Sequence, residues 1–142
     1  MGCNKHSAVA GGHGAALSAD PERARDVVAT LARNLPPGVP VTAKVRLQAS
    51  AAASLELCRR LEAAGAAAVI VHARSAAEGP SVGARWAALA PLVAALAVPV
   101  IGNGDVWDAD DARDKARPRP GRRRTPEAGV PECAACAAAR CL

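Results

Sequence analysis

Apolar residues concentrate in three short runs, Val39–Leu47, Ala67–His72 and Val98–Gly102. The runs recur at intervals of roughly 30 residues, the length of a strand with its crossover helix. Unbroken apolar runs such as Val98 to Ile101 are typical of parallel strands that are buried on both faces. The pattern therefore predicts three strands of a parallel sheet and an α/β fold.

Helical patterns fill the intervals between these runs. The first follows Asp20 as N-cap and Pro21 as first helical residue, and its apolar positions recur with helical spacing. The second covers Ser50–Ala64, and the third covers residues 89–96, where Pro91 predicts a late start or a kink. This alternation fits both an open doubly wound sheet and a piece of a (β/α)8 barrel.

Charge divides the 142-residue chain into two parts. The net charge is +5, and from position 113 onward eight basic side chains stand against three acidic ones, which accounts for all of it. The chain has no Phe or Tyr, so its core must be built from Val, Leu, Ile and Ala. We therefore expect a folded part at 1–112 and a basic, disordered tail at 113–142, for which nonspecific RNA binding is one possible role.

The five cysteines come without an apolar N-terminal segment, and no stretch reaches the roughly 20 apolar residues of a membrane span. These features predict an intracellular protein without disulfides and without membrane contact. Three of the cysteines, Cys133, Cys136 and Cys141, lie in the tail. Because they lack a fourth ligand nearby, we expect no metal site.

The first candidate for a catalytic residue is Cys3. Lys5 follows it two residues later, and a glycine-rich turn follows several residues after that. A nearby cation favours the thiolate, so Cys3 is a candidate acid or nucleophile. Glycines allow close backbone approach there, although a glycine-rich segment is also consistent with an ordinary loop.

Polar residues also end each apolar run, where parallel α/β enzymes place their functional groups. In VTAKVRL, Lys44 and Arg46 share one face of the predicted strand. They could contact a ligand, or they could lie on an edge strand and reach solvent. The next two runs end in His72 and Arg74, then in Asn103 and Gly104. We expect Lys44, His72 and Asn103 to converge on one mouth of the sheet, with Lys44 the most buried cation.

The order of these motifs is specific. The segments MGCNK, GGHGAAL, DP, VTAKVR, VIVHAR and VPVIGNGD resemble those of the tRNA dihydrouridine synthases, which read approximately MGCPK, GGMGAAL, DP, VTVKIR, ITVHGR and IPVIANGD. The resemblance runs from Met1 to about Val106, with compatible spacing, and is greatest to the eukaryotic branch. It implies part of a (β/α)8 barrel with parallel strands.

The resemblance also implies a function: FMN-dependent reduction of uridine to 5,6-dihydrouridine in the D loop of tRNA, with NAD(P)H as reductant. Cys3 would be the general acid that protonates uracil C5. The residues that would hold FMN are Lys44, His72, Asn103 and Gly104. Weaker candidates for substrate or cofactor contact are Lys5, Arg46 and Arg74.

The chain departs from the family pattern at Asn4, where the family has proline, and at His13, where methionine is usual. Because the matched motifs cover only part of a barrel, two alternatives stay open. One is a noncatalytic fragment of such an enzyme, and the other is an RNA-interacting protein that acts through its basic tail.

Overall fold

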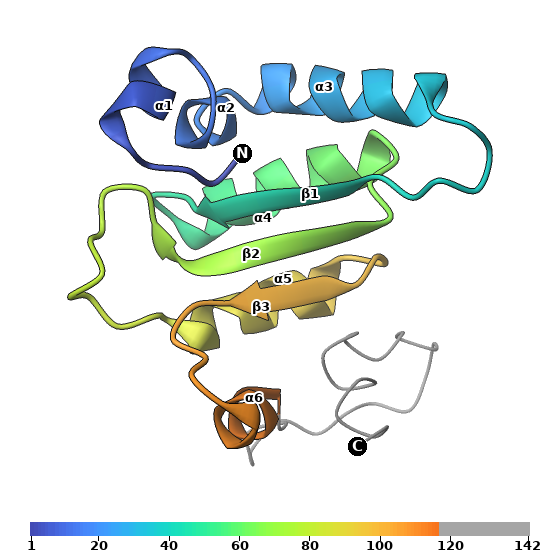
Figure 1. Ribbon diagram of the computed structural model, residues 1–142. Coiled ribbons are helices and arrows are strands. Elements are labelled where there is room, and N and C mark those ends of the chain that lie inside the picture. Colours follow the sequence, from blue (N-terminus) through green and yellow to red (C-terminus); the bar gives the residue numbers. More distant parts are fainter. Residues whose placement is uncertain (117–142) are drawn as a thin grey trace.

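A three-stranded parallel sheet forms the centre of the computed structural model, which describes residues 1–116. Its strands are β1 (Thr42–Leu47), β2 (Ala68–Ser75) and β3 (Val100–Asn103), in the order β1-β2-β3 (Figure 1). The α/β fold and the three strands predicted from the sequence are confirmed. The predicted tail lies outside the described part except for residues 113–116, and its three cysteines lie wholly outside it.

The first two predicted helices form, and each has a side-chain cap at its N-terminus. In α3 (Pro21–Asn34), the Asp20 carboxylate accepts a hydrogen bond from the Arg23 backbone at 3.1 Å. In α4 (Ala51–Ala63), the Ser50 hydroxyl accepts one from the Ala53 backbone at 3.0 Å. Each cap satisfies a backbone N–H that the helix itself leaves unpaired.

The third predicted helix starts late, as Pro91 indicated. A 3-10 turn, η1 (Trp86–Leu89), leads into α5 (Ala90–Ala95), with Pro91 in the first turn, where its missing N–H costs nothing. This short helix packs against α4, so the two cover the same side of the sheet (Figure 1).

Three further helices form where none was predicted: α1 (His6–Ala10), α2 (Ala15–Ser18) and α6 (Ala109–Ala116). The signal for α6 was present in the sequence. The Asp108 carboxylate caps the helix by accepting from the Asp111 backbone N–H at 2.8 Å, and the Asp111 carboxylate accepts from the Trp107 backbone N–H. This helix crosses position 112, where the sequence analysis divided the chain; the division itself stays a prediction.

The core lies between the helices and one face of the sheet. Along β1, Ala43, Val45 and Leu47 are buried, while Thr42 and Lys44 on the other face are exposed. Figure 1 shows α4 and α5 on one side of the sheet and no described helix across the other. Among residues 1–116, no helix is long and apolar enough to span a bilayer.

Candidate functional site

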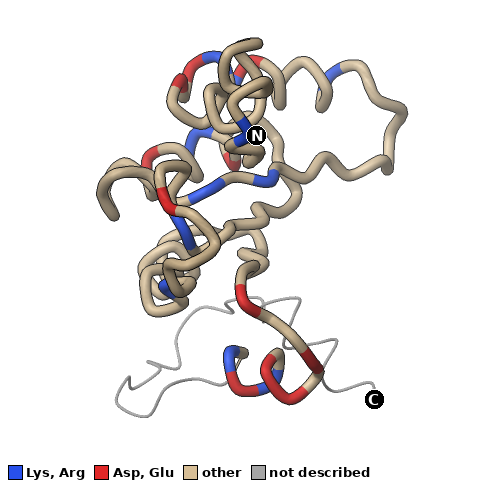
Figure 2. Tube along the Cα trace, turned by 60° about the vertical axis from the view of Figure 1, so that its left-hand side comes forward, with Lys and Arg blue, Asp and Glu red and all other residues tan. Residues whose placement is uncertain are grey.

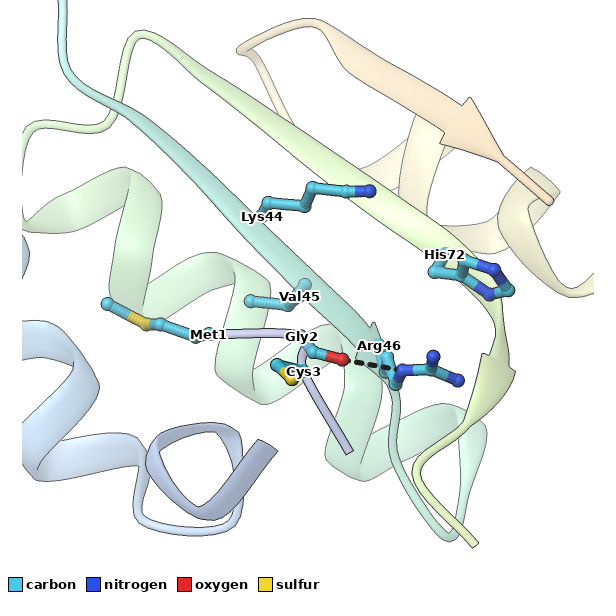
Figure 3. Close-up of a pocket in the computed structure, with 7 residues that line it drawn as sticks. All are labelled: Met1, Gly2, Cys3, Lys44, Val45, Arg46 and His72. Atoms are coloured by element: carbon cyan, nitrogen blue, oxygen red, sulfur yellow. Dashed lines mark hydrogen bonds between the residues drawn. The ribbon is translucent and has the colours of Figure 1, made fainter. Parts of the chain in front are cut away.

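A cavity of about 280 Å³ opens at the uncovered face of the sheet, beside the carboxyl end of β1 (Figure 3). It is lined by Met1, Gly2, Cys3, Lys44, Val45, Arg46 and His72. The parallel register places Arg46 opposite His72, so neighbouring strands deliver their polar side chains to the same place. Four residues that the sequence analysis singled out separately therefore meet in one cavity.

The expected convergence of Lys44, His72 and Asn103 is confirmed. Lys44 Nζ donates to Asn103 Oδ1 at 3.0 Å, which connects β1 to β3 across the middle strand. His72 pairs with Asn103 in the sheet register and with Arg46 on its other side.

The expectation that Lys44 is the most buried cation is wrong. Lys44 is exposed, whereas Arg74 retains only 8% of its accessible surface, the least of any described cation. The reason is the open face of the sheet: within the described residues no second layer covers Lys44.

His72 lines the cavity and carries an unpaired polar atom. Its Nδ1 is buried, and it has no hydrogen-bond partner among the described residues. Burial lowers the pKa of this imidazole, and the positive charges of Arg46, Arg74 and Lys44 lower it further. At neutral pH the ring is therefore uncharged, with one nitrogen able to donate and the other to accept.

Cys3 lies at the cavity with an exposed side chain. Lys5, two residues on, precedes α1 with its side chain exposed, and it does not line the cavity. The structure therefore brings Cys3 to Lys44 and His72, and leaves Lys5 outside this group.

Arg46 points toward the Cys3 segment, and each of its three guanidinium nitrogens donates a hydrogen bond. The acceptors are the Gly2 carbonyl (2.7 Å, dashed in Figure 3), the Ser75 carbonyl (3.2 Å) and Asn4 Oδ1 (3.4 Å). All three acceptors are uncharged protein groups.

Arg74 turns away from the cavity. It forms an ion pair with Asp105 and donates to the Val82 and Pro80 carbonyls. A register shift after Arg46 skips two residues of β2, Ala73 and Arg74, and such a bulge redirects side chains. The arginine thereby connects the loop after β2 to the loop after β3.

Asp105 and Trp86 have a clear structural role that the sequence analysis did not assign to them. The Asp105 carboxylate accepts from the Ala84 backbone at 2.7 Å, and this bond, together with Arg74, lowers its pKa. The Trp86 indole donates to the Gly104 carbonyl at 2.8 Å and fills the space left by the missing side chain of Gly102. The Asn-Gly-Asp turn at a strand end was the available signal for Asp105.

Charged residues of both signs also lie outside this cavity in the described part of the chain. Figure 2 shows basic and acidic residues interspersed along the described chain, with both signs on the helix that precedes the grey trace. Residues 1–116 contain no group of His, Cys, Asp and Glu side chains arranged to hold a metal ion.

Parallel strands with cationic and polar residues at their carboxyl ends define a class of α/β proteins that bind ligands at this edge. The comparison with protein families is specific. Residues 1–117 match the model of the dihydrouridine synthase (Dus) family. The matched region extends past Val106 and includes α6. The chain belongs to this family, and its sheet is a segment of a (β/α)8-type barrel.

Individual relatives support the same family assignment. A tRNA-dihydrouridine(16) synthase of Cupriavidus necator is 41% identical over 101 residues, 70% of this chain and 31% of that protein. The enzyme of the same name from Pseudomonas syringae is 37% identical over 101 residues, 70% of this chain and 32% of its own length. A probable tRNA-dihydrouridine synthase of Rhodobacter capsulatus is 36% identical over 118 residues, 80% and 35% of the two chains.

The chain thus spans about a third of the length of these curated relatives. The narrower expectation, a special similarity to the eukaryotic branch, is not confirmed by relatives from Cupriavidus, Pseudomonas and Rhodobacter.

Proposed function

We propose that this chain acts in the reduction of uridine to 5,6-dihydrouridine in the D loop of tRNA, with FMN as cofactor and NAD(P)H as reductant. One observation carries the proposal: Cys3, Lys44 and His72, from three separate motifs, line a single cavity. The printed names of the relatives state that those proteins are tRNA-dihydrouridine synthases.

The polar groups at the cavity fit a planar cofactor with carbonyl and ring-nitrogen acceptors. Lys44 brings an exposed ammonium group held by Asn103, and His72 carries a buried ring nitrogen that has no hydrogen-bond partner within residues 1–116. Lys44, His72, Asn103 and Gly104 are therefore the residues that hold FMN in this proposal. Bound there, FMN would supply the hydride for uracil C6, with NAD(P)H as the source of the reducing electrons.

The protein's own contributions are a charge and a proton. The Lys44 ammonium would stabilise negative charge on the bound cofactor. The Cys3 thiol donates its proton to uracil C5, and the resulting thiolate recovers a proton from solvent. The neutral His72 accepts or donates one hydrogen bond and adds no further positive charge.

A chimaeric enzyme tests this assignment. Residues 1–117 would replace the matching segment of the Cupriavidus necator relative, and dihydrouridine would be measured by mass spectrometry in tRNA that lacks it. We expect the chimaera to form dihydrouridine. Its Cys3→Ala variant should keep bound FMN and lose activity by about 10²- to 10⁴-fold, the usual contribution of a positioned general acid.

The control is Cys58→Ala, which removes a buried thiol on α4 that does not line the cavity. It should leave the activity of the chimaera nearly unchanged. Full turnover by the Cys3→Ala variant would refute the role of Cys3, and loss of FMN from that variant would identify a structural cysteine.

A further inference from the structure

The backbone that carries Cys3 is held at every residue. Three consecutive carbonyls each accept a hydrogen bond from a different part of the fold. The donors are Ser18 Oγ to Met1 (2.6 Å), Arg46 Nε to Gly2 (2.7 Å) and the Ala15 backbone N–H to Cys3 (2.8 Å). Two of the donors belong to α2, and the third, Arg46, is the only one from the sheet.

Arg46 connects this segment to two strands at once. Its guanidinium group donates to Gly2 and Asn4 on either side of Cys3, and to Ser75 at the end of β2. The planar fork of an arginine can satisfy several carbonyl acceptors in fixed directions, which a lysine cannot do. Because these acceptors are neutral protein groups, the guanidinium group is engaged in structure at the edge of the ligand cavity.

We propose that Arg46 is a positioning residue that fixes the backbone around Cys3 against the carboxyl end of β1. The thiol is thereby presented to the cavity that Lys44 and His72 line. This assignment rests on the proposed role of Cys3 as proton donor, and it differs from a role for Arg46 as a ligand of an anionic group.

The opposite side of the segment is packed equally closely. Gly14 has a φ of +62°, and a Cβ atom at this position would lie 2.4 Å from the Cys3 carbonyl oxygen and 3.1 Å from Cys3 Cβ. Only glycine fits a backbone that approaches so closely in this conformation. Cys3 is thus fixed between the glycine-rich turn and Arg46, and the loss of either contact should release it.

Hydrogen exchange in the full-length chain tests the proposal directly, because the Ala15 amide is bonded to the Cys3 carbonyl. In Arg46→Lys, NMR should show Ala15 exchange accelerated about tenfold or more, the effect of losing a charge-assisted hydrogen bond on a local equilibrium. The amide of the fully buried Leu61, which reports global unfolding, should be unchanged. Arg59→Lys, a substitution of an exposed arginine on α4, is the matched control.

Unchanged Ala15 exchange in folded Arg46→Lys would overturn the proposal. The wild-type chain provides a second measurement if that variant does not fold. The Arg46 Nε–H signal, assigned through its proximity to Gly2, should stay in place when inorganic phosphate is added. A shift that follows the phosphate concentration would identify Arg46 as an anion ligand. Neither measurement requires turnover, so failure here is distinct from failure of the proposed activity.

Discussion

The His72 imidazole illustrates how burial and charge combine at a single residue. Its Nδ1 has no partner within the described chain, yet the ring lies beside Arg46, Arg74 and Lys44. Burial and neighbouring positive charge both disfavour the protonated ring, while Asp105 opposes them weakly. A neutral ring suits a hydrogen bond to an uncharged edge of a cofactor or base.

We expect NMR titration of the full chain to give His72 a pKa below its ordinary value of 6.5. In Lys44→Met the pKa should rise toward 6.5, because one nearby positive charge is removed. The rise should be partial, since burial is the largest cause and Lys44 is only one of three cations. Lys5→Met, at an exposed lysine outside the cavity, should leave His72 unaffected. A wild-type pKa above 6.5 would contradict this account.

At the same scale, the sequence predicted which residues meet but not what each one contacts. Lys44, His72 and Asn103 converge because they lie on neighbouring parallel strands, toward the same edge of the sheet, a consequence of topology that strand patterns reveal. The hydrogen bonds of Arg46 and the burial of Arg74 depend on a bulge and on loops whose paths no periodicity records. The sequence motifs therefore identified Arg46 and Arg74 but did not predict which groups they bind.

Among the elements, two loops are joined into one unit behind the cavity. Asp105 accepts from Arg74 and from the Ala84 backbone, and Trp86 donates to the Gly104 carbonyl. Gly104 has a φ of +119°, and its backbone packs against the His72 ring. The loop after β3 thereby supports the position of a candidate ligand-binding side chain on β2.

Gly104→Ala should disturb this arrangement. Its new Cβ atom would lie 3.0 Å from Ala84 Cβ and 3.3 Å from His72 Cε1, in a backbone conformation that side chains rarely adopt. Gly38→Ala is the matched control, because Gly38 also has a positive φ, of +88°, but nothing lies within 4 Å of the added atom. Both variants carry the conformational cost, and only Gly104→Ala adds the packing cost.

We expect Gly104→Ala to be less stable than Gly38→Ala by about 1–3 kcal/mol, the usual cost of overpacking a filled site. Urea denaturation measures this difference, and the His72 resonances should shift only in Gly104→Ala. Equal free energies of unfolding for the two variants would show that the loop relaxes and does not support the ring.

Helices and strands followed from local chemistry where caps and periodicity were strong. Asp20, Pro21 and Ser50 marked the starts of α3 and α4 correctly. Helix α6 was missed because its composition is polar on all sides, although Asp108 caps its N-terminus. Short helices such as α1 and α2 depend on tertiary contacts, which sequence periodicity over four or five residues does not show.

In the described molecule as a whole, one face of the sheet is packed and the other is open. This arrangement explains both the success and the error of the sequence analysis. Family motifs and strand spacing identified a segment of a parallel barrel, but Lys44, predicted to be the most buried cation, is exposed on the open face. The cavity is therefore a shallow, basic surface with one side formed by the Cys3 segment.

The openness of this face bears on how firmly the chain can hold FMN. A cofactor of this kind is bound by its phosphate as well as by its ring, and phosphates require directed donors. Within residues 1–116, Arg46 donates to three protein acceptors at the cavity, and Arg74 is paired with Asp105. Lys44 is left as the main cation for a ligand, and it acts at the ring edge in the proposed function.

We therefore expect the full chain, purified with excess FMN, to be colourless after gel filtration and inactive on tRNA by itself. In equilibrium titrations it should nevertheless quench FMN fluorescence in a saturable way. Lys44→Met should weaken this binding, whereas Lys5→Met should not, because only Lys44 lines the cavity. A stoichiometric yellow complex after gel filtration would contradict the argument, since it would require phosphate contacts beyond those of residues 1–116 or an assembly of several copies.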